Sequence, residues 1–369
     1  MKMKAALYYG PHDIRIENVE RPKAEDGIDG HGVLIRVKAN GICNIKDTAW
    51  WQKACPDYVG TGIALGHENS GEVVEIGSKI TSLKVGDRVS GYAFQPCLKC
   101  DACKAKNFAR CTRPTEGSGG TWINGSMAEY LLVPYIGNDK PWKLPDNVTY
   151  FDAALSEPTT LGIGLANKAK PGDVVVILGQ ELMGIATVAW LKEKGVGKVI
   201  ASDVSKKRLQ AAKELGANII VNELEQDVVK VVMEETKGWG ADVVIETSRR
   251  PINFQQAIAI AQPMGAIWLT SEPYYVHYAL HPNLEQLPGS PHRTPQKQVM
   301  GMRQGFSIRN AWGTLGDGDI RRQQAIKLMQ DGKITAKKHV TQTFPLEKVE
   351  EAFKAALDPH ESIKVMFEP

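Results

Sequence analysis

The sequence predicts an α/β protein that joins a β-rich unit to a doubly wound parallel sheet. Short runs rich in Val, Ile, Tyr and Leu fill the first third, such as KAALYY, GVLIRVKA and AEYLLV, with Gly, Pro and Asp between them. After about residue 155, the apolar run DVVVILG is typical of a strand buried on both faces. Strands then alternate with helical segments at the spacing of βαβ units, which indicates a parallel sheet.

The parallel-sheet part is expected to contain the strands KVIASD, NIIV and ADVVIETS and the helices MGIATVAWLKEKG and KKRLQAAKELGA. Gly195 ends the first of these helices. Residues 273–305 lack clear periodicity, and two interpretations stay open: a loop that shapes a substrate pocket or subunit contact, or a solvated insertion. The chain resumes with FSIRNAWG and ends with the helix VEEAFKAALD and the strand SIKVMF.

The composition is that of a globular protein and excludes several classes. Hydrophobic residues make up 43% and charged residues 24% of the 369 positions, which argues against a disordered, collagen-like or coiled-coil chain. The net charge of +3 comes with no basic stripe or aromatic platform, so we expect no nucleic-acid partner. No signal-peptide or membrane-spanning run is visible, so we expect a cytoplasmic protein without a membrane partner.

Four cysteines form the pattern C-x2-C-x2-C-x7-C, within a lobe at about residues 95–113. They are Cys97, Cys100, Cys103 and Cys111. Such short spacings let a chain wrap four thiolates around one ion, which gives a closed tetrahedral zinc site with no position for water. The pattern therefore predicts a structural zinc ion that holds the lobe together.

A second set of metal-ligating side chains is spread over the first 157 residues. Cys43 follows a β-like run, His67 and Glu68 lie in LGHENSGEVVEIG, and Glu157 begins EPTT. Sulfur, imidazole and carboxylate together suit zinc, and three protein ligands would leave a fourth position for water or an alcohol. Each residue also has a simpler interpretation, for example that Glu157 only begins a helix.

These motifs, in this order, resemble the zinc-dependent medium-chain dehydrogenase/reductase family, in particular its sorbitol and threonine dehydrogenase branch. The resemblance rests on GHExxGxVxxxG, the four-cysteine lobe and the dinucleotide fold, and covers nearly the whole chain. It implies a GroES-like catalytic domain over 1–157 and 314–369 and a Rossmann nucleotide-binding domain over 158–313. It also implies two zinc ions per chain and a homodimer or homotetramer.

The resemblance assigns roles to the second set of ligands. Cys43 and His67 would bind the catalytic zinc, and Glu68 and Glu157 would be direct or exchangeable third ligands. Since Glu-Pro stands at the corresponding place in the sorbitol and threonine dehydrogenase branch, Glu157 is the expected third ligand, and Glu68 the ligand that exchanges.

The segment after Cys43 departs from the family pattern, which continues with Gly, Ser or Thr, and Asp. This chain has Asn44, Ile45 and Lys46 there, and Asp47 follows one position late. Either Asp47 still reaches the zinc-bound histidine, or the groups behind the ligands are rebuilt. The usual hydroxyl of the proton relay is missing at Ile45. Thr48 or Lys46 would replace it, unless Lys46 attracts an anionic substrate group or lies on the surface without a role.

The segment ILGQELMG is expected to bind a dinucleotide, because it follows a strand and opens a helix. Gly179 and Gly184 match the first and third glycines of G-x-G-x-x-G, and Leu182 and Met183, which lie between them, are expected to contact the cofactor. Glu181 replaces the second glycine and brings bulk and negative charge to the place of two phosphates. It opposes binding unless it turns outward or pairs with a basic residue.

The next strand ends at Asp203, 19 residues after Gly184, where an acid accepts hydrogen bonds from the adenosine ribose. This favours NAD over NADP, with Arg208 nearby as part of the site. Asp203 is also a candidate N-cap of the following helix. Thr247 and Ser248 close ADVVIETS, where the family's chain passes under the cofactor. Two arginines follow them, and contact with phosphate and an exposed loop pair are equally open interpretations.

The sequence thus predicts a zinc-dependent oxidoreductase that transfers hydride between NAD and a small-molecule alcohol or ketone. The resemblance implies a secondary alcohol, polyol, sugar-derived alcohol or amino alcohol, and Arg249, Arg250 and Lys46 hint at an anionic one. A zinc-free reductase of activated double bonds is a poor match, since such members lack the Cys, His and Glu set. A non-catalytic or cofactor-impaired member stays open because of Glu181 and Ile45.

Overall fold

A computed structural model of the chain describes residues 1–27, 30–52, 60–91, 100–105, 124–134, 141–270, 307–310 and 318–369. The chain forms two compact units. The first comprises Met1–Thr160, Gly316–Asp358 and Lys364–Pro369, and the second comprises Leu161–Leu315 and Pro359–Ile363. The domain boundaries given above stay a prediction. None of the helices in the described ranges is long and apolar enough to cross a membrane.

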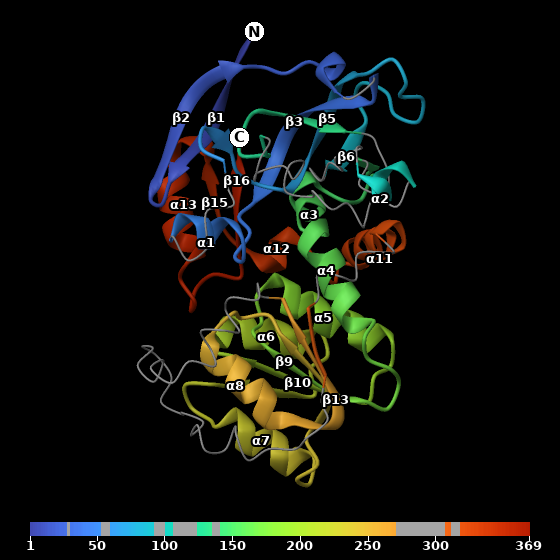
Figure 1. The fold of residues 1–369 in the computed structure, drawn as a ribbon, viewed down its shortest axis with the longest axis vertical. Coiled ribbons are helices and arrows are strands. Elements are labelled where there is room, and N and C mark those ends of the chain that lie inside the picture. Colours follow the sequence, from blue (N-terminus) through green and yellow to red (C-terminus); the bar gives the residue numbers. More distant parts are fainter. Residues whose placement is uncertain are drawn as a thin grey trace. The chain divides into compact units, whose positions relative to one another are not determined.

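The first unit is built on two mainly antiparallel sheets, which confirms the β-rich unit (Figure 1). One sheet has the strand order β2-β1-β4, and the other has the order β15-β16-β3-β5-β6-β8, with β7 also paired to β3. The strands are β1 (Lys2–Gly10), β2 (Asp13–Glu20), β3 (Gly32–Gly41), β4 (Ile63–Ala64), β5 (Glu68–Ile76), β6 (Arg88–Gly91), β7 (Tyr130–Pro134), β8 (Trp142–Lys143), β15 (Val340–Pro345) and β16 (Lys364–Glu368).

Short helices connect and cover these sheets. They are α1 (Asp47–Trp51), α2 (Asp101–Lys104), α3 (Tyr150–Ala154), α11 (Gly318–Gln330), α12 (Ala336–His339) and α13 (Val349–Ala356), with 3-10 turns at Ala24–Asp26 and Leu346–Lys348. Helix α13 packs its apolar face on the sheet, where Phe353 stacks on Trp51 of α1 at 5.1 Å between ring centroids. This packing anchors α1, the helix that begins beside Cys43.

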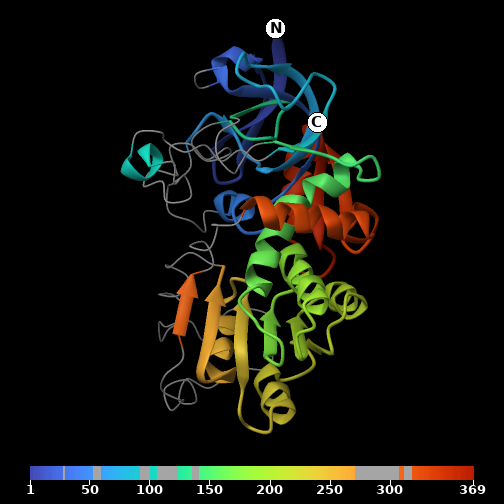
Figure 2. The same cartoon turned by 90° about the vertical axis from the view of Figure 1, so that its right-hand side faces the viewer.

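The second unit contains one parallel six-stranded sheet with the order β11-β10-β9-β12-β13-β14 (Figure 2). Its strands are β9 (Val174–Leu178), β10 (Lys198–Asp203), β11 (Ile219–Asn222), β12 (Ala241–Glu246), β13 (Ala261–Leu269) and β14 (Ser307–Asn310). The connecting helices are α5 (Leu182–Glu193), α6 (Lys206–Glu214), α7 (Val228–Glu235) and α8 (Pro251–Ile260). This order is that of the doubly wound Rossmann fold, which confirms the predicted fold class.

The two kinds of helix in this unit follow from their sequences. Helix α5 is apolar nearly all round and is buried, whereas α6 is amphipathic and buries one face. Helix α5 packs on α6, and α7 on α8, as expected when helices cover both faces of a parallel sheet. Helix α4 (Ser156–Ala166) begins in the first unit and ends in the second. The strand order reverses between β9 and β12, which is where ligands bind in such sheets.

Candidate functional site

Cys43, His67 and Glu68 lie together, and we call them the Cys–His–Glu cluster. One ligand atom of each lies within 4.8 Å of the others. The antiparallel pairing of β3 with β5 explains this, because Gly41 at the end of β3 lies opposite Glu68 at the start of β5. Cys43 is therefore brought next to His67 and Glu68, although it precedes them by 24 and 25 positions in the chain. The cluster has the donor set that zinc accepts.

Asp47 lies behind the cluster, fully buried at the start of α1. Its Oδ2 accepts a hydrogen bond from the main-chain N–H of Cys43 at 2.9 Å. Its Oδ1 accepts no hydrogen bond within the described part of the chain and lies 3.9 Å from Nδ1 of His67. Burial raises the pKa of Asp47, while His67 and the Cys43 N–H lower it. Of the two alternatives above, the geometry favours the one in which Asp47 reaches His67 despite its shifted position.

Lys364 holds the carboxylate of Glu68, a contact that the sequence analysis missed. Its Nζ lies 2.7 Å from Oε2 and 2.9 Å from Oε1 of Glu68, and donates to the carbonyl of Ile42 at 2.9 Å. The side chains of Lys364 and Glu68 are 3% and 1% exposed. The sequence did carry a signal for this contact, since Lys364 begins the apolar terminal strand KVMFE. A charge that is buried with such a strand requires a partner.

Glu157 lies in the first turn of α4 and outside the Cys–His–Glu cluster. Burial raises the pKa of Glu157 to about 7; His67 lowers this pKa and Glu68 raises it. Glu157 is therefore close enough to the cluster for the charges of His67 and Glu68 to shift its pKa. Its role as a metal ligand stays a prediction.

The charges around the cluster fit a divalent metal ion. Burial raises the pKa of the Cys43 thiol, and the neighbouring Glu68 and Asp47 raise it further. Cys43, Asp47 and Glu68 thus share a buried site, to which Lys364 supplies one positive charge. A zinc ion would compensate the remaining negative charge and favour the thiolate.

The residues proposed for a proton relay lie beside the cluster. The hydroxyl of Thr48 is buried and donates to the main-chain oxygen of Asn44 at 2.6 Å. The main-chain N–H of Lys46 donates to Sγ of Cys43 at 3.3 Å, and its Nζ lies 5.7 Å from the ring centroid of Trp50. Neither contact distinguishes Thr48 from Lys46 as the relay, so both stay predictions.

Only part of the four-cysteine lobe is described. Cys103 is buried in α2, and Cys100 is the residue before this helix. Cys97 and Cys111 lie outside the described residues, as does segment 273–305. The structural zinc site is therefore a prediction from spacing.

The turn after β9 has the close packing expected of a dinucleotide loop. Gly179 has φ +98°, and a Cβ there would lie 2.7 Å from the main-chain N of Ser248. A Cβ on Gly184 would lie 2.2 Å from the oxygen of Gly179. Thr247 donates its hydroxyl to the same oxygen at 2.8 Å. Both positions thus require glycine. The predicted residues at the ends of β9 and β12 lie together where the strand order of the sheet reverses.

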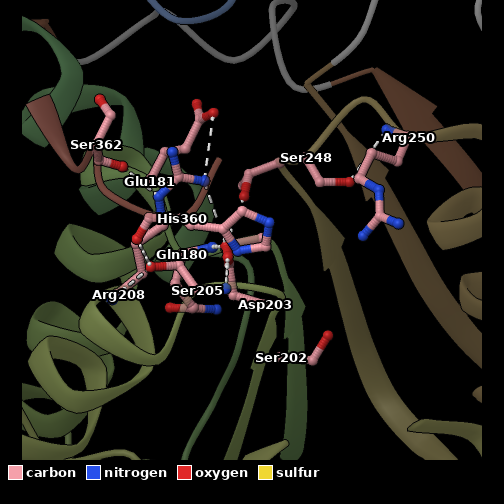
Figure 3. Close-up of polar contacts among 12 residues, drawn as sticks. Gln180, Glu181, Ser202, Asp203, Ser205, Arg208, Ser248, Arg250, His360 and Ser362 are labelled. Carbon is pink, nitrogen blue, oxygen red and sulfur yellow. Dashed lines mark hydrogen bonds and ion pairs between the residues drawn. The ribbon is translucent and has the colours of Figure 1, made fainter. Parts of the chain in front are cut away.

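Glu181 is the residue before α5 and pairs with a base (Figure 3). Nη1 of Arg208 lies 3.7 Å from Oε1 of Glu181 and 3.6 Å from Oδ2 of Asp203. Nε of Arg208 donates to the carbonyl of Ser362 at 2.5 Å. Glu181 therefore takes the second of the two arrangements that make its charge tolerable. Leu182 and Met183, also predicted to contact the cofactor, are buried in the first turn of α5.

The carboxylate of Asp203 is buried and organises the loop around it. Its Oδ2 accepts from the N–H of Gln180 at 2.6 Å, and its Oδ1 accepts from the N–H of Ser205 at 2.8 Å. The N-cap of α6 is Ser205, whose hydroxyl accepts from the N–H of Arg208, so the proposed N-cap role of Asp203 was wrong. A carboxylate oxygen has two lone pairs, so Asp203 can still accept from ribose hydroxyls. Gln180, which stands at a variable position of the glycine motif, was not predicted to belong to this site.

The two arginines after β12 are both partly buried, so they are not a simple exposed pair, and their contact with phosphate stays a prediction. Arg250 lies 2.8 Å from the buried carboxylate of Glu223. Arg249 has φ +59°, a conformation that favours glycine, and its N–H donates to Glu246 at 2.7 Å. Burial raises the pKa of Glu246 to about 7, although hydrogen bonds from Ser248 and the N–H of Arg249 lower it.

Comparison with known proteins identifies the family. The model described as "Alcohol dehydrogenase GroES-like domain" matches residues 29–146, and that described as "Zinc-binding dehydrogenase" matches 183–274. The probable D-xylulose reductase A of Aspergillus clavatus is 31% identical over 353 residues, which cover 94% of this chain and 91% of that protein. The sorbitol dehydrogenase of Bacillus subtilis is 30% identical over 371 residues, which cover 100% of this chain and 97% of that protein. The chain belongs to the zinc-dependent medium-chain alcohol dehydrogenase family.

A solved structure of this alcohol dehydrogenase fold is similar over the whole length. An alcohol dehydrogenase from Escherichia coli CFT073, complexed with NADH, superposes with a TM-score of 0.77 at 25% identity and covers 100% of this chain and 99% of that chain. Membership of the alcohol dehydrogenase family confirms the resemblance found in the sequence and the oxidoreductase class.

Proposed function

We propose that this chain is a zinc-dependent dehydrogenase that transfers hydride between NAD and a secondary alcohol of the polyol or sugar-derived class. The observation that carries the proposal is the Cys–His–Glu cluster with Asp47 behind it. The curated relatives that carry the names sorbitol dehydrogenase and D-xylulose reductase support the substrate class. The similar E. coli enzyme complexed with NADH supports the cofactor.

Different residues of the first unit would bind the metal and position its ligands. Cys43 and His67 would hold the catalytic zinc, with Glu157 as third ligand and Glu68 as exchangeable ligand. When bound, zinc supplies a Lewis acid that lowers the pKa of the substrate's hydroxyl group. Asp47 would orient the imidazole of His67 through Nδ1 and keep it a good ligand.

Glu68 and the proton relay complete the site. Lys364 would keep the carboxylate of Glu68 engaged, so that a coordination position stays available to substrate. Thr48 or Lys46 would carry the proton of the alcohol away from the site. Cys97, Cys100, Cys103 and Cys111 would hold a second, structural zinc.

The loop between β9 and α5 would bind the dinucleotide. Gly179 and Gly184 give the tight turn, and Asp203 would accept hydrogen bonds from the adenosine ribose. Leu182 and Met183 would flank the phosphates at the start of α5. Arg208 offsets the charge of Glu181, so that the carboxylate in the loop is compatible with phosphate. Homodimer or homotetramer formation stays a prediction.

The test is a parallel calorimetric titration of the purified protein with NAD and NADP, on protein checked for zinc and resident nucleotide. Saturable binding with NAD preferred, followed by NAD reduction with sorbitol, xylitol or 2,3-butanediol, would support the proposal. Metal removal with a chelator should abolish turnover, and added zinc should restore it. Binding of neither dinucleotide, with no resident nucleotide, would overturn it and favour the cofactor-impaired alternative, in which Glu181 closes the loop.

A further inference from the structure

Glu223 stands next to Asp203 at the carboxyl ends of neighbouring strands. It follows β11, and its main-chain N–H donates to the carbonyl of Asp203 at 3.1 Å. The hydroxyl of Ser202, one position before Asp203, donates to Oε1 of Glu223 at 2.7 Å. Glu223 is thus hydrogen-bonded through its main chain to the acid that we assign to the adenosine ribose, and burial and the charge of Asp203 both raise the pKa of Glu223.

The side chain of Glu223 binds an arginine from a third element. Nη1 of Arg250, the residue before α8, lies 2.8 Å from Oε2 of Glu223, and Nδ2 of Asn253 donates to Oε1 at 2.9 Å. The carboxylate is 1% exposed, whereas the side chain of Arg250 is 31% exposed. Burial of Glu223 raises its pKa, and Arg250 and Ser202 oppose this effect. Arg250 thus compensates the buried charge of Glu223, while part of the Arg250 side chain faces solvent.

Arg208, in the helix α6 that follows β10, is also held by carboxylates. Arg208 lies between Glu181 and Asp203, and its Nε donates to the carbonyl of Ser362 (Figure 3). An arginine near the ribose acid is what accommodates the 2′-phosphate of NADP in dinucleotide folds. Both Arg208 and Arg250 are engaged by acids.

We propose that Glu223 is a determinant of cofactor choice: it ties Arg250 to the protein and so withholds this arginine from adenosine ligands that carry a 2′-phosphate. The inference rests on the proposed function, since it assumes that this edge binds the adenosine part of a dinucleotide. It goes beyond the expected role of Asp203, because the deciding contact is made by a residue 20 positions later. The ligand class that the edge accepts is an adenosine nucleotide with free ribose hydroxyls.

The test uses two ligands that differ only in the 2′-phosphate, 5′-AMP and 2′,5′-ADP, in calorimetric titrations of the full chain. Glu223→Gln keeps an oxygen that accepts from Ser202 and Asn253 but removes the charge that holds Arg250. We expect the variant to bind 2′,5′-ADP about tenfold more tightly than the parent protein, the size of one charge-assisted hydrogen bond. We expect 5′-AMP to change less than about twofold, because it gains no such bond.

Two further variants decide what causes a gain. Glu225→Gln removes an exposed acid two positions away, which pairs with Lys206, and should leave both affinities unchanged. Glu223→Gln combined with Arg250→Leu should lose the gain, because the released guanidinium is then absent. Thermal unfolding of each variant confirms that it is folded.

The remaining outcomes contradict the inference in distinguishable ways. An equal gain in Glu225→Gln, or a gain that survives loss of Arg250, would show a general charge effect and overturn the role of Glu223. Unchanged binding of 2′,5′-ADP by Glu223→Gln, with 5′-AMP bound normally, would overturn it as well while leaving the proposed function intact. Binding of neither ligand by any of the proteins would overturn the proposed nucleotide site, and this inference with it.

Discussion

The carboxylate of Asp47 touches two members of the Cys–His–Glu cluster at once. One oxygen accepts the main-chain N–H of Cys43 at 2.9 Å, and the other lies 3.9 Å from Nδ1 of His67. Asp47 stands one position later than the family pattern places its acid. Because α1 begins at Asp47, the carboxylate lies at a helix start and beside the loop that carries Cys43. The contact to His67 is thus present although the motif is shifted.

The first prediction concerns this contact. Asp47→Asn should weaken zinc binding at the cluster about 10- to 100-fold, because the imidazole loses the acid that orients it and raises its basicity. Competition with a chromophoric chelator measures the affinity of this site. Asp13→Asn, which changes an exposed acid paired with Arg15, is the matched control and should leave the affinity unchanged. Equal affinity in Asp47→Asn and the parent would contradict the proposed orientation of His67.

The second prediction separates the two zinc sites. Cys43→Ala should lower the zinc content from about two ions per chain to about one without unfolding the protein, because the four-cysteine lobe keeps its own ligands. Elemental analysis after gel filtration gives the content, and circular dichroism checks the fold. Cys55→Ala, which changes a cysteine with no ligand spacing around it, is the control and should retain both ions. Loss of both ions, or of neither, in Cys43→Ala would show that the ligands are wrongly assigned.

The third prediction concerns the buried pair of Lys364 and Glu68. Lys364→Met leaves the carboxylate of Glu68 buried without its cation, so the free energy of unfolding should fall by roughly 3–5 kcal/mol. Adding Glu68→Gln to this variant removes the unpaired charge and should restore a large part of the loss. Denaturant unfolding of the metal-free proteins gives both values. Additive losses in the double variant would mean that the two side chains are not coupled.

The fourth prediction tests Glu181 in two steps. Glu181→Gly restores the second glycine of the phosphate loop and releases Arg208, so NAD should bind more tightly, by about tenfold if one adverse charge is removed. Glu181→Gln removes the charge and keeps the volume. Comparing the two variants by calorimetry separates charge from bulk. Unchanged NAD binding by Glu181→Gly would show that Glu181 is accommodated, and weaker binding would show that its ion pair with Arg208 is useful to the site.

The fifth prediction is a pH dependence that arises from Glu246. Burial raises the pKa of Glu246 to about 7 in the folded protein, so between its ordinary pKa and this value the folded state binds the extra proton. Its contribution therefore makes the fold less stable as the pH rises through this window, by up to roughly 3 kcal/mol. Glu246→Gln does not titrate, so its stability relative to the parent should increase from pH 4.5 to 7.5. Parallel thermal scans measure this difference, and a constant difference would contradict the raised pKa.

The sequence by itself determined the fold class and the family of this protein. The signals that predicted them are local: the hydrophobic periodicity, the apolar run before Gly179 and the spacing of GHExxGxVxxxG. Local signals can be read without knowing which distant residues come into contact. The positions of Gly179 and Gly184 were predictable for the same reason, because tight turns demand glycine whatever packs around them. The roles of the ligating and cofactor-binding residues follow from the resemblance and stay predictions.

Tertiary structure alone decided which charges meet. Lys364 and Glu68 are 296 positions apart, and Arg250 and Glu223 are 27 apart, so no local pattern links them. The pairing of Glu181 with Arg208 likewise depends on how α6 lies against the loop after β9. A buried charge needs a partner, but the partner's identity depends on the contacts between distant elements, which only the folded chain defines.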